Sequence, residues 1–138
     1  MKALDAVDVA AFKTSQIAAL TTDQIKNGLT TDQVAGLSSA QVAAFTTNQI
    51  ANGFTTEQIV ALTTRQAQSL STAQTAALNT DQVKALETAD LAVMTTAQVA
   101  AFTTNQIVNG FTTEQIVALS SAQAGALTTA QTAALTSD

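Results

Sequence analysis

Residues 20–36 read LTTDQIKNGLTTDQVAG, a unit of nine residues followed by a variant of the same unit with eight. The pattern is a large apolar residue, two hydroxyl residues, a variable residue, Gln, a branched apolar residue and a short, mostly small tail. Counted outward from this stretch, sixteen complete units run from Leu4, and a truncated unit begins at Leu135. Because a tandem repeat dictates the whole architecture, the physics of one unit is the basis for predicting the fold.

Each unit carries the signature of a helix N-terminus. Thr21 is followed three residues later by Gln24, which is the spacing of a capping box, in which the two side chains satisfy backbone N–H groups reciprocally. Leu20 and Ile25 then fall on either side of this cap, where two apolar residues pack together and fix the entry angle of the chain. The unit therefore predicts one short helix that starts with a cap.

Other positions in the unit agree with this prediction. A carboxylate often stands in the first turn, where it complements the positive end of the helix dipole; these residues are Asp23, Asp32, Glu57, Asp81 and Glu114. The three ninth residues are Gly after Asn, and we expect each Gly to close a helix in the left-handed conformation; they are Gly28, Gly53 and Gly110. Three units depart from the pattern: one has no Gln at Asp8, one has no capping side chain at Lys13, and one lacks both, with Glu87 and Asp90 in their places.

A single long helix is excluded by the length of the repeat. Eight residues advance about 800° at ~100° per residue, so successive Leu positions would wrap around the rod. The predicted fold class is all-α, a tightly wound α-solenoid of very short capped helices, one per unit. A β-solenoid is the alternative, because Thr and Val favour strands. The sequence leaves open whether two or three units complete a turn of the superhelix.

The units depend on one another for stability. Burying the two large apolar side chains of a unit gives about 2–3 kcal/mol each, whereas ordering eight residues costs about 12 kcal/mol. We therefore expect residues 1–138 to form a single repeat array, and the truncated last unit suggests a fragment of a longer protein. The sequence also contains a longer repeat, because residues 45–62 recur almost unchanged at residues 102–119. Segmental duplication explains this longer repeat.

Composition argues against several functions. The chain has no His, Cys, Trp, Tyr or Pro, so the usual general base, thiolate ligands and nucleophile–base pairs are missing. We expect no enzymatic activity, no catalytic residue, no cofactor and no metal site. The net charge is -5, with five scattered basic residues, and we therefore expect no nucleic-acid partner. No apolar stretch is long enough to cross a bilayer or to form a signal peptide, so we expect no membrane insertion.

Paired hydroxyl residues are the surface feature left for function. The first of each pair has a capping role, and the solenoid would align the second in rows. We take six of these as candidate ligand-facing residues, for ice, a glycan or a protein: Thr31, Thr47, Thr56, Thr96, Thr104 and Thr113. The alternative interpretation is a solvated first helical turn with no ligand.

Units such as LTTDQVAG from Leu29, LSSAQVAA from Leu37 and LTTAQTAA from Leu127 resemble the octapeptide arrays of large bacterial surface or secreted proteins of the adhesin type. The resemblance runs from Phe12 to the C-terminus, and residues 4–11 are a degenerate copy. It implies a non-catalytic spacer or stalk that is extracellular or at the cell surface, if the parent protein is exported. We expect its partners to be flanking domains of the same parent chain, or other copies that associate through the array ends. A binding module is the alternative function.

Overall fold

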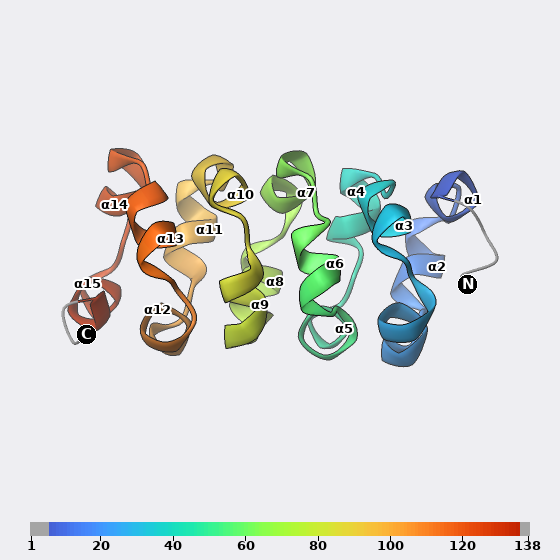
Figure 1. Ribbon diagram of the computed structural model, residues 1–138, viewed down its shortest axis with the longest axis horizontal. Helices are drawn as coiled ribbons and strands as arrows, with labels where there is room; N and C mark the ends of the chain where they lie inside the picture. The colour runs from blue at the N-terminus through green and yellow to red at the C-terminus, as the bar shows by residue number, and fades with distance from the viewer. Residues whose placement is uncertain (1–5, 136–138) are drawn as a thin grey trace.

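The computed structural model describes residues 6–135, which form an elongated stack of short helices (Figure 1). The first and the last helix lie at opposite ends of the long axis. Sixteen helices and no strand occur within the described residues, so the all-α prediction is confirmed and the β-solenoid alternative is wrong.

One helix of five to seven residues corresponds to each unit. The helices are α1 (Ala6–Ala10), α2 (Thr14–Ala18), the π-helical turn η1 (Gln24–Gly28), α3 (Thr31–Ala35), α4 (Ser39–Ala43), α5 (Thr47–Gly53), α6 (Thr56–Val60), α7 (Thr64–Ser69), α8 (Thr72–Ala77), α9 (Thr80–Ala85), α10 (Thr88–Val93), α11 (Thr96–Ala101), α12 (Thr104–Asn109), α13 (Thr113–Ala118), α14 (Ser121–Gly125) and α15 (Thr129–Leu135).

The predicted capping box forms in nearly every unit. In α7, the Gln66 N–H donates to the Thr63 hydroxyl at 3.2 Å, and the Thr63 N–H donates to Gln66 Oε1 at 2.9 Å. The departures are the expected ones, because neither Lys13 nor Glu87 accepts a side-chain capping bond. The capping-box prediction is therefore confirmed in the described units.

Each unit meets units three and four places along the chain. Backbone packing joins helices three units apart, such as α3 with α6 and α7 with α10. Hydrogen bonds from Gln side chains join helices four units apart, such as α4 with α1 and α7 with α3. One turn of the superhelix therefore holds between three and four units, a number that the sequence analysis did not consider.

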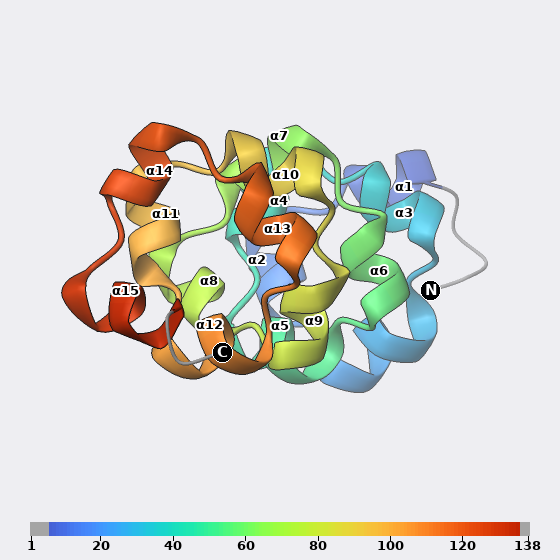
Figure 2. The ribbon, with the colours of Figure 1, turned by 60° about the vertical axis from the view of Figure 1, so that its left-hand side comes forward.

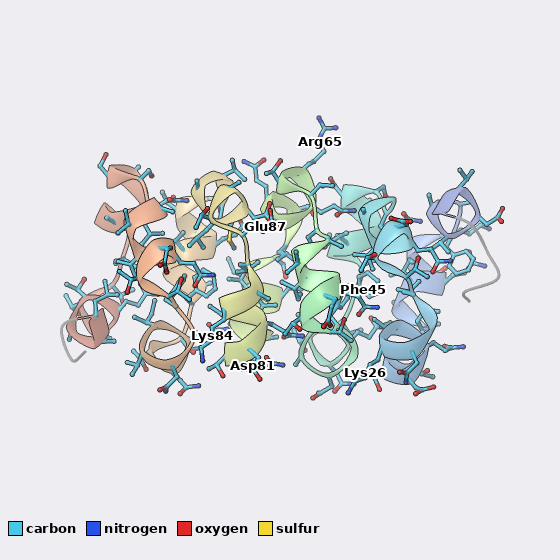
Figure 3. All side chains as sticks on the ribbon, in the orientation of Figure 1. Lys26, Phe45, Arg65, Asp81, Lys84 and Glu87 are labelled. Atoms are coloured by element: carbon cyan, nitrogen blue, oxygen red, sulfur yellow. The ribbon has the colours of Figure 1, made fainter. Side chains whose placement is uncertain are left out.

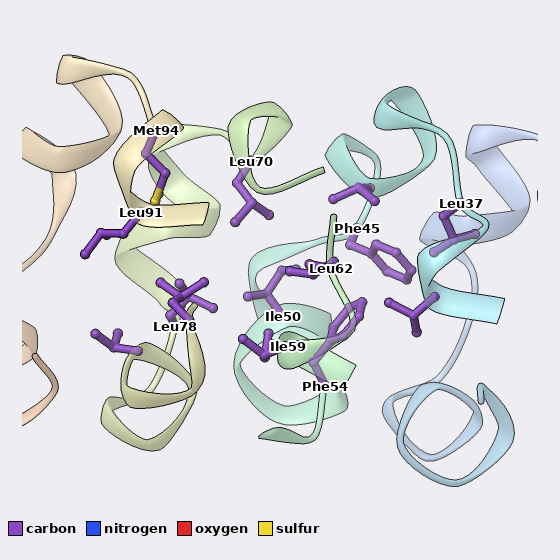
Figure 4. Close-up of a cluster of buried hydrophobic side chains, with 14 of the residues drawn as sticks. Leu37, Phe45, Ile50, Phe54, Ile59, Leu62, Leu70, Leu78, Leu91 and Met94 are labelled. Atoms are coloured by element: carbon purple, nitrogen blue, oxygen red, sulfur yellow. The ribbon is translucent and has the colours of Figure 1, made fainter. Parts of the chain in front are cut away.

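The core is a continuous column inside this superhelix (Figure 4). It consists of the large apolar residue that opens each unit and the branched apolar residue that follows each Gln, for example Leu62 and Ile59. Phe45 and Phe54 open consecutive units, and their rings meet edge to face with centroids 4.9 Å apart. The apolar positions identified in the unit are thus the positions that hold the turns together.

The extra Gly residues correct one prediction. No residue in the described part of the chain has a positive φ, so these Gly residues do not close helices in the left-handed conformation. Space is the reason for Gly instead. A Cβ on Gly53 would lie 3.2 Å from Cδ1 of Ile25, and a Cβ on Gly110 would lie 2.5 Å from the Gln106 carbonyl oxygen and 3.0 Å from Val83 Cβ. Limited space, rather than chain reversal, therefore favours Gly at these two positions, against another turn at Gly53 and against both its own unit and another turn at Gly110.

Candidate functional site

The Gln of each unit makes contacts at both ends of its amide. In Gln66, Oε1 accepts from the N–H that begins its own helix, while Nε2 donates to the carbonyls of Val34 at 2.8 Å and Leu37 at 2.7 Å. Val34 lies in the last turn of α3, four units earlier, and Leu37 opens the unit that follows α3. Carbonyls at the C-terminus of an α-helix lack the regular partner four residues on, and the Gln66 amide donates to this region in addition to the Leu37 N–H, which lies 3.1 Å from the Val34 oxygen. One side chain therefore caps the start of one helix and the end of another.

This double cap recurs along the array. The distance from Nε2 to the carbonyl of the large apolar residue that opens the unit three places earlier is 2.6–2.9 Å in every case. The residues concerned are Gln41, Gln49, Gln58, Gln66, Gln74, Gln82, Gln98, Gln106, Gln115, Gln123 and Gln131. All eleven are buried, so the amide row is an internal feature of the solenoid.

The bond from Nε2 to an earlier turn was not predicted from the sequence, although the choice of residue at this position indicated it. Glu serves a capping box as well as Gln does, yet no unit carries Glu at this position. The repeated choice of Gln therefore indicated a need for the N–H donor of the amide, because a carboxylate can only accept hydrogen bonds.

Asp90 breaks the row. It stands where other units have Gln, is 2% exposed, and its Oδ2 is buried without a hydrogen-bond partner. The shorter acidic side chain caps neither Glu87 at the start of α10 nor the carbonyl of Leu62, which opens the unit three places earlier. Burial, with a smaller contribution from the charge of Glu87, raises the pKa of Asp90 from 3.8 to about 6. This unit is therefore an electrostatic defect inside an otherwise regular array.

The six candidate Thr residues are all exposed and open the first turns of their helices. Thr31 and Thr56 lie on α3 and α6, which pack against each other, and Thr113 lies on α13 on the same side of the molecule in Figure 1. Helices α5 and α12, which begin with Thr47 and Thr104, lie along the lower edge. Helix α11, which begins with Thr96, lies behind α13. The superhelix therefore distributes the helices that carry these hydroxyls around its circumference.

The lower edge of the molecule in Figures 1 and 2 holds η1, α5, α9 and α12. Each nine-residue unit there joins its Asn to a polar residue four positions earlier, at 2.6–2.8 Å. The pairs are Asn27 with Asp23, Asn52 with Asn48, and Asn109 with Asn105. Because the partners already satisfy one another, the pairing accounts for these residues without a ligand.

Apart from Asp90, the charged side chains of residues 6–135 are exposed (Figure 3). Lys26, Asp81 and Lys84 extend from the lower edge, and Arg65 projects from the opposite edge. Glu57 is fully exposed, and hydrogen bonds from its own backbone N–H and from the Thr56 hydroxyl lower its pKa. No group of three or more potential metal-ligating residues occurs in residues 6–135. In the same part of the chain, no helix is long and apolar enough to cross a membrane.

A pocket of about 220 Å³ opens near the C-terminal end of the array. Its walls include Ile107, Phe111 and Ile116, with Leu135 and two Thr residues. The lining is mainly apolar and holds no titratable group, so the pocket has the character of an uncovered packing surface rather than of a catalytic centre.

Comparison with known proteins agrees with the repeat architecture. Searches of curated proteins and of solved structures gave no match to this chain. The model of the ALTTAQ repeat family matches five stretches, at residues 1–38, 27–52, 53–88, 83–109 and 108–137. These matches cover nearly all of the sequence, and the predicted LTTxQ-type tandem repeat is thereby confirmed. The chain belongs to the ALTTAQ repeat family.

Proposed function

We propose that this array is a non-catalytic spacer or stalk that sets the distance between other parts of an exported, adhesin-like surface protein. The observation that carries the proposal is the double cap of Gln66 and its equivalents, which each unit makes only with units three or four places away. Length can then be changed by adding units, because no interaction depends on the total number present.

The surface supports the same function. Every large buried apolar side chain in residues 6–135 contributes to the central column, and most outward positions carry small or polar residues that no neighbouring unit requires. A stalk needs stiffness and length more than a shaped cleft. The proposal includes the absence of enzymatic activity, and reproducible turnover by the pure protein would contradict it.

The length of the array tests the proposal directly. We expect chains carrying one or two additional copies of residues 54–110 to lengthen in equal steps, measured by small-angle X-ray scattering. A scrambled insert of identical composition is the control, since it adds mass without the repeat. A maximum dimension that fails to increase with added copies would rule out a spacer.

Surface location needs a separate test in the source cells. We expect antibodies against the folded array to label intact cells as strongly as permeabilised ones. Labelling that requires permeabilisation would rule out the stalk of a surface protein while leaving the spacer role intact.

A binding module is the second candidate, favoured by the hydroxyls of the second position. Thr47 and its neighbour Thr46 are both exposed, but only Thr46 is used in the cap, where it accepts from the Gln49 N–H at 3.1 Å. We would expect thermal hysteresis, or binding on a glycan array, that is lost when Thr31, Thr56 and Thr113 are changed together to Ala. Equal behaviour of the wild type and this variant in both assays would exclude recognition through these hydroxyls.

A further inference from the structure

The N-terminal end of the array displays hydrogen-bond donors that the interior uses. Gln16 and Gln24 are exposed, and their Oε1 atoms accept from the N–H groups of Lys13 and Thr21 as in other units. Their Nε2 groups have no partner among the described residues, because no turn of described helices lies in front of them. In the interior, the same group reaches the turn before it in each Gln that completes a capping box from Gln41 to Gln131.

The C-terminal end displays the matching acceptors. In the interior, the carbonyl oxygen of the large apolar residue that opens a unit accepts from Nε2 of the Gln three units later. Phe102, for example, accepts from Gln131 at 2.6 Å. Leu119 and Leu127 occupy this position beyond the last such bond. Within residues 6–135, no side-chain amide reaches their carbonyls.

The apolar side chains show the same difference between interior and ends. From Leu29 to Phe102, every residue that opens a unit is at most 6% exposed. Their equivalents near the ends are only partly buried, and these are Phe12 and Leu20 on one side and Phe111, Leu119, Leu127 and Leu135 on the other. The pocket beside Ile116 and Phe111 belongs to the same uncovered surface.

The two end surfaces are therefore the two halves of the interface that the array already makes between its own turns. The spacing also agrees, because Gln16 and Gln24 lie in consecutive units, as do Leu119 and Leu127. We propose that the N-terminal end of one chain docks on the C-terminal end of a second copy, with the amides of Gln16 and Gln24 donating to unpaired carbonyls such as those of Leu119 and Leu127.

This contact is heterologous, since donors occupy one end and acceptors the other. A head-to-tail contact between unlike surfaces does not close a pair; it leaves a free donor end and a free acceptor end for the next copy. The expected product is a linear series of chains that extends along the superhelix axis and whose average length rises with concentration.

The test is sedimentation velocity of the 138-residue chain over a wide range of concentrations, with two variants. Gln16→Glu with Gln24→Glu keeps the oxygen that caps each helix and removes the donor. The matched control, Ala40→Glu with Ala97→Glu, adds the same charge at exposed first-turn positions on α4 and α11. Circular dichroism verifies that both variants are folded.

We expect the wild type and the control to associate with the same concentration dependence. The Gln variant should associate roughly tenfold more weakly for each amide lost, as the loss of a hydrogen bond implies. Wild-type chains that stay monomeric at every concentration would overturn the proposal, as would a Gln variant that associates like the control.

A mixing experiment separates head-to-tail stacking from any symmetric dimer. The Gln variant still has an intact C-terminal surface, so it can bind the donor end of a wild-type chain but cannot bind further at its own donor end. A small amount of it should therefore shorten wild-type assemblies. A closed dimer that is insensitive to this addition would contradict the proposed geometry.

Discussion

Nε2 of Gln66 lies 2.7 Å from the carbonyl oxygen of Leu37, a residue 29 positions earlier in the chain and one superhelical turn away. The other end of the same amide begins helix α7, because Oε1 accepts from the Thr63 N–H. The same side chain that caps its own helix therefore also connects two turns of the superhelix. The stability of the array is therefore sensitive to single atoms of a side chain that is buried in most units.

Gln66→Glu should lower the free energy of unfolding by about 3 kcal/mol. The variant keeps the capping oxygen but buries a charge against carbonyls that have lost their donor. Chemical denaturation gives the value. Gln16→Glu is the control, because its amide is exposed and makes no bond to another turn, and its effect should stay within about 0.5 kcal/mol. Equal effects at the two positions would show that the capping bond alone matters.

Asp90→Gln should raise the free energy of unfolding by about 2 kcal/mol. It restores the donor to the Leu62 carbonyl and the acceptor to the Glu87 N–H, and it removes an unpaired buried acidic group. Ala89→Gln, which places the same amide on the surface beside it, should leave the denaturation midpoint unchanged. A midpoint that falls in Asp90→Gln would mean that this unit cannot accommodate the regular side chain.

Asp90 should also make stability depend on pH. Because its pKa is about 6 in the folded chain and 3.8 ordinarily, the folded state binds the proton more tightly. Unfolding free energy is then highest below about pH 4, falls as the pH rises to about 6, and is constant above that. Thermal melts of the wild type and of Asp90→Asn across this range isolate the contribution as their difference. A difference that does not change with pH would refute it.

Gly110→Ala should destabilise the chain by about 1–3 kcal/mol, because the added methyl group meets both the Gln106 carbonyl and Val83. Gly125→Ala is the matched substitution, since nothing lies within 4 Å of a Cβ at that position. Gly125→Ala should stabilise the helix by about 0.5–1 kcal/mol, because Ala loses less backbone conformational freedom on folding than Gly does. Melting temperatures that move in the same direction would contradict the steric explanation.

Thr46→Ala should cost about 1 kcal/mol through the lost cap. Thr47→Ala should change the free energy of unfolding by less than about 0.5 kcal/mol, although both side chains are exposed. Urea denaturation of the two variants separates the structural hydroxyl from the one that is free for a ligand. A larger loss for Thr47→Ala would assign it a structural role as well.

Local features of the unit were predictable because their physics is local. The cap of Thr21 and Gln24, and the burial of Ile25 beside them, follow from residues within a few positions of one another. The number of units in a turn was not predictable in this way, because it depends on contacts about thirty residues apart such as Gln66 with Leu37. The role of Gly53 was missed for the same reason, since its neighbour Ile25 belongs to another turn.

The candidate Thr residues illustrate the same limit. The capping role of Thr46 could be read from its spacing to Gln49. The position of Thr47 relative to Thr96 or Thr104 could not, because placing units around a superhelix requires its pitch. The predicted exposure of these hydroxyls agrees with the structure, whereas their recognition of a ligand stays a prediction.

The packing of each unit against the third and the fourth unit gives the duplicated stretches a meaning. Residues 45–62 and 102–119 are seven units apart, and seven units make about two turns, so both copies face the same side. An ancestral gene that gained repeats in blocks of seven would therefore keep each face of the molecule in phase. Inserting a number of units that is not a multiple of seven would rotate all later units around the superhelix axis. The block whose duplication preserves the faces is therefore the pair of turns rather than the octapeptide.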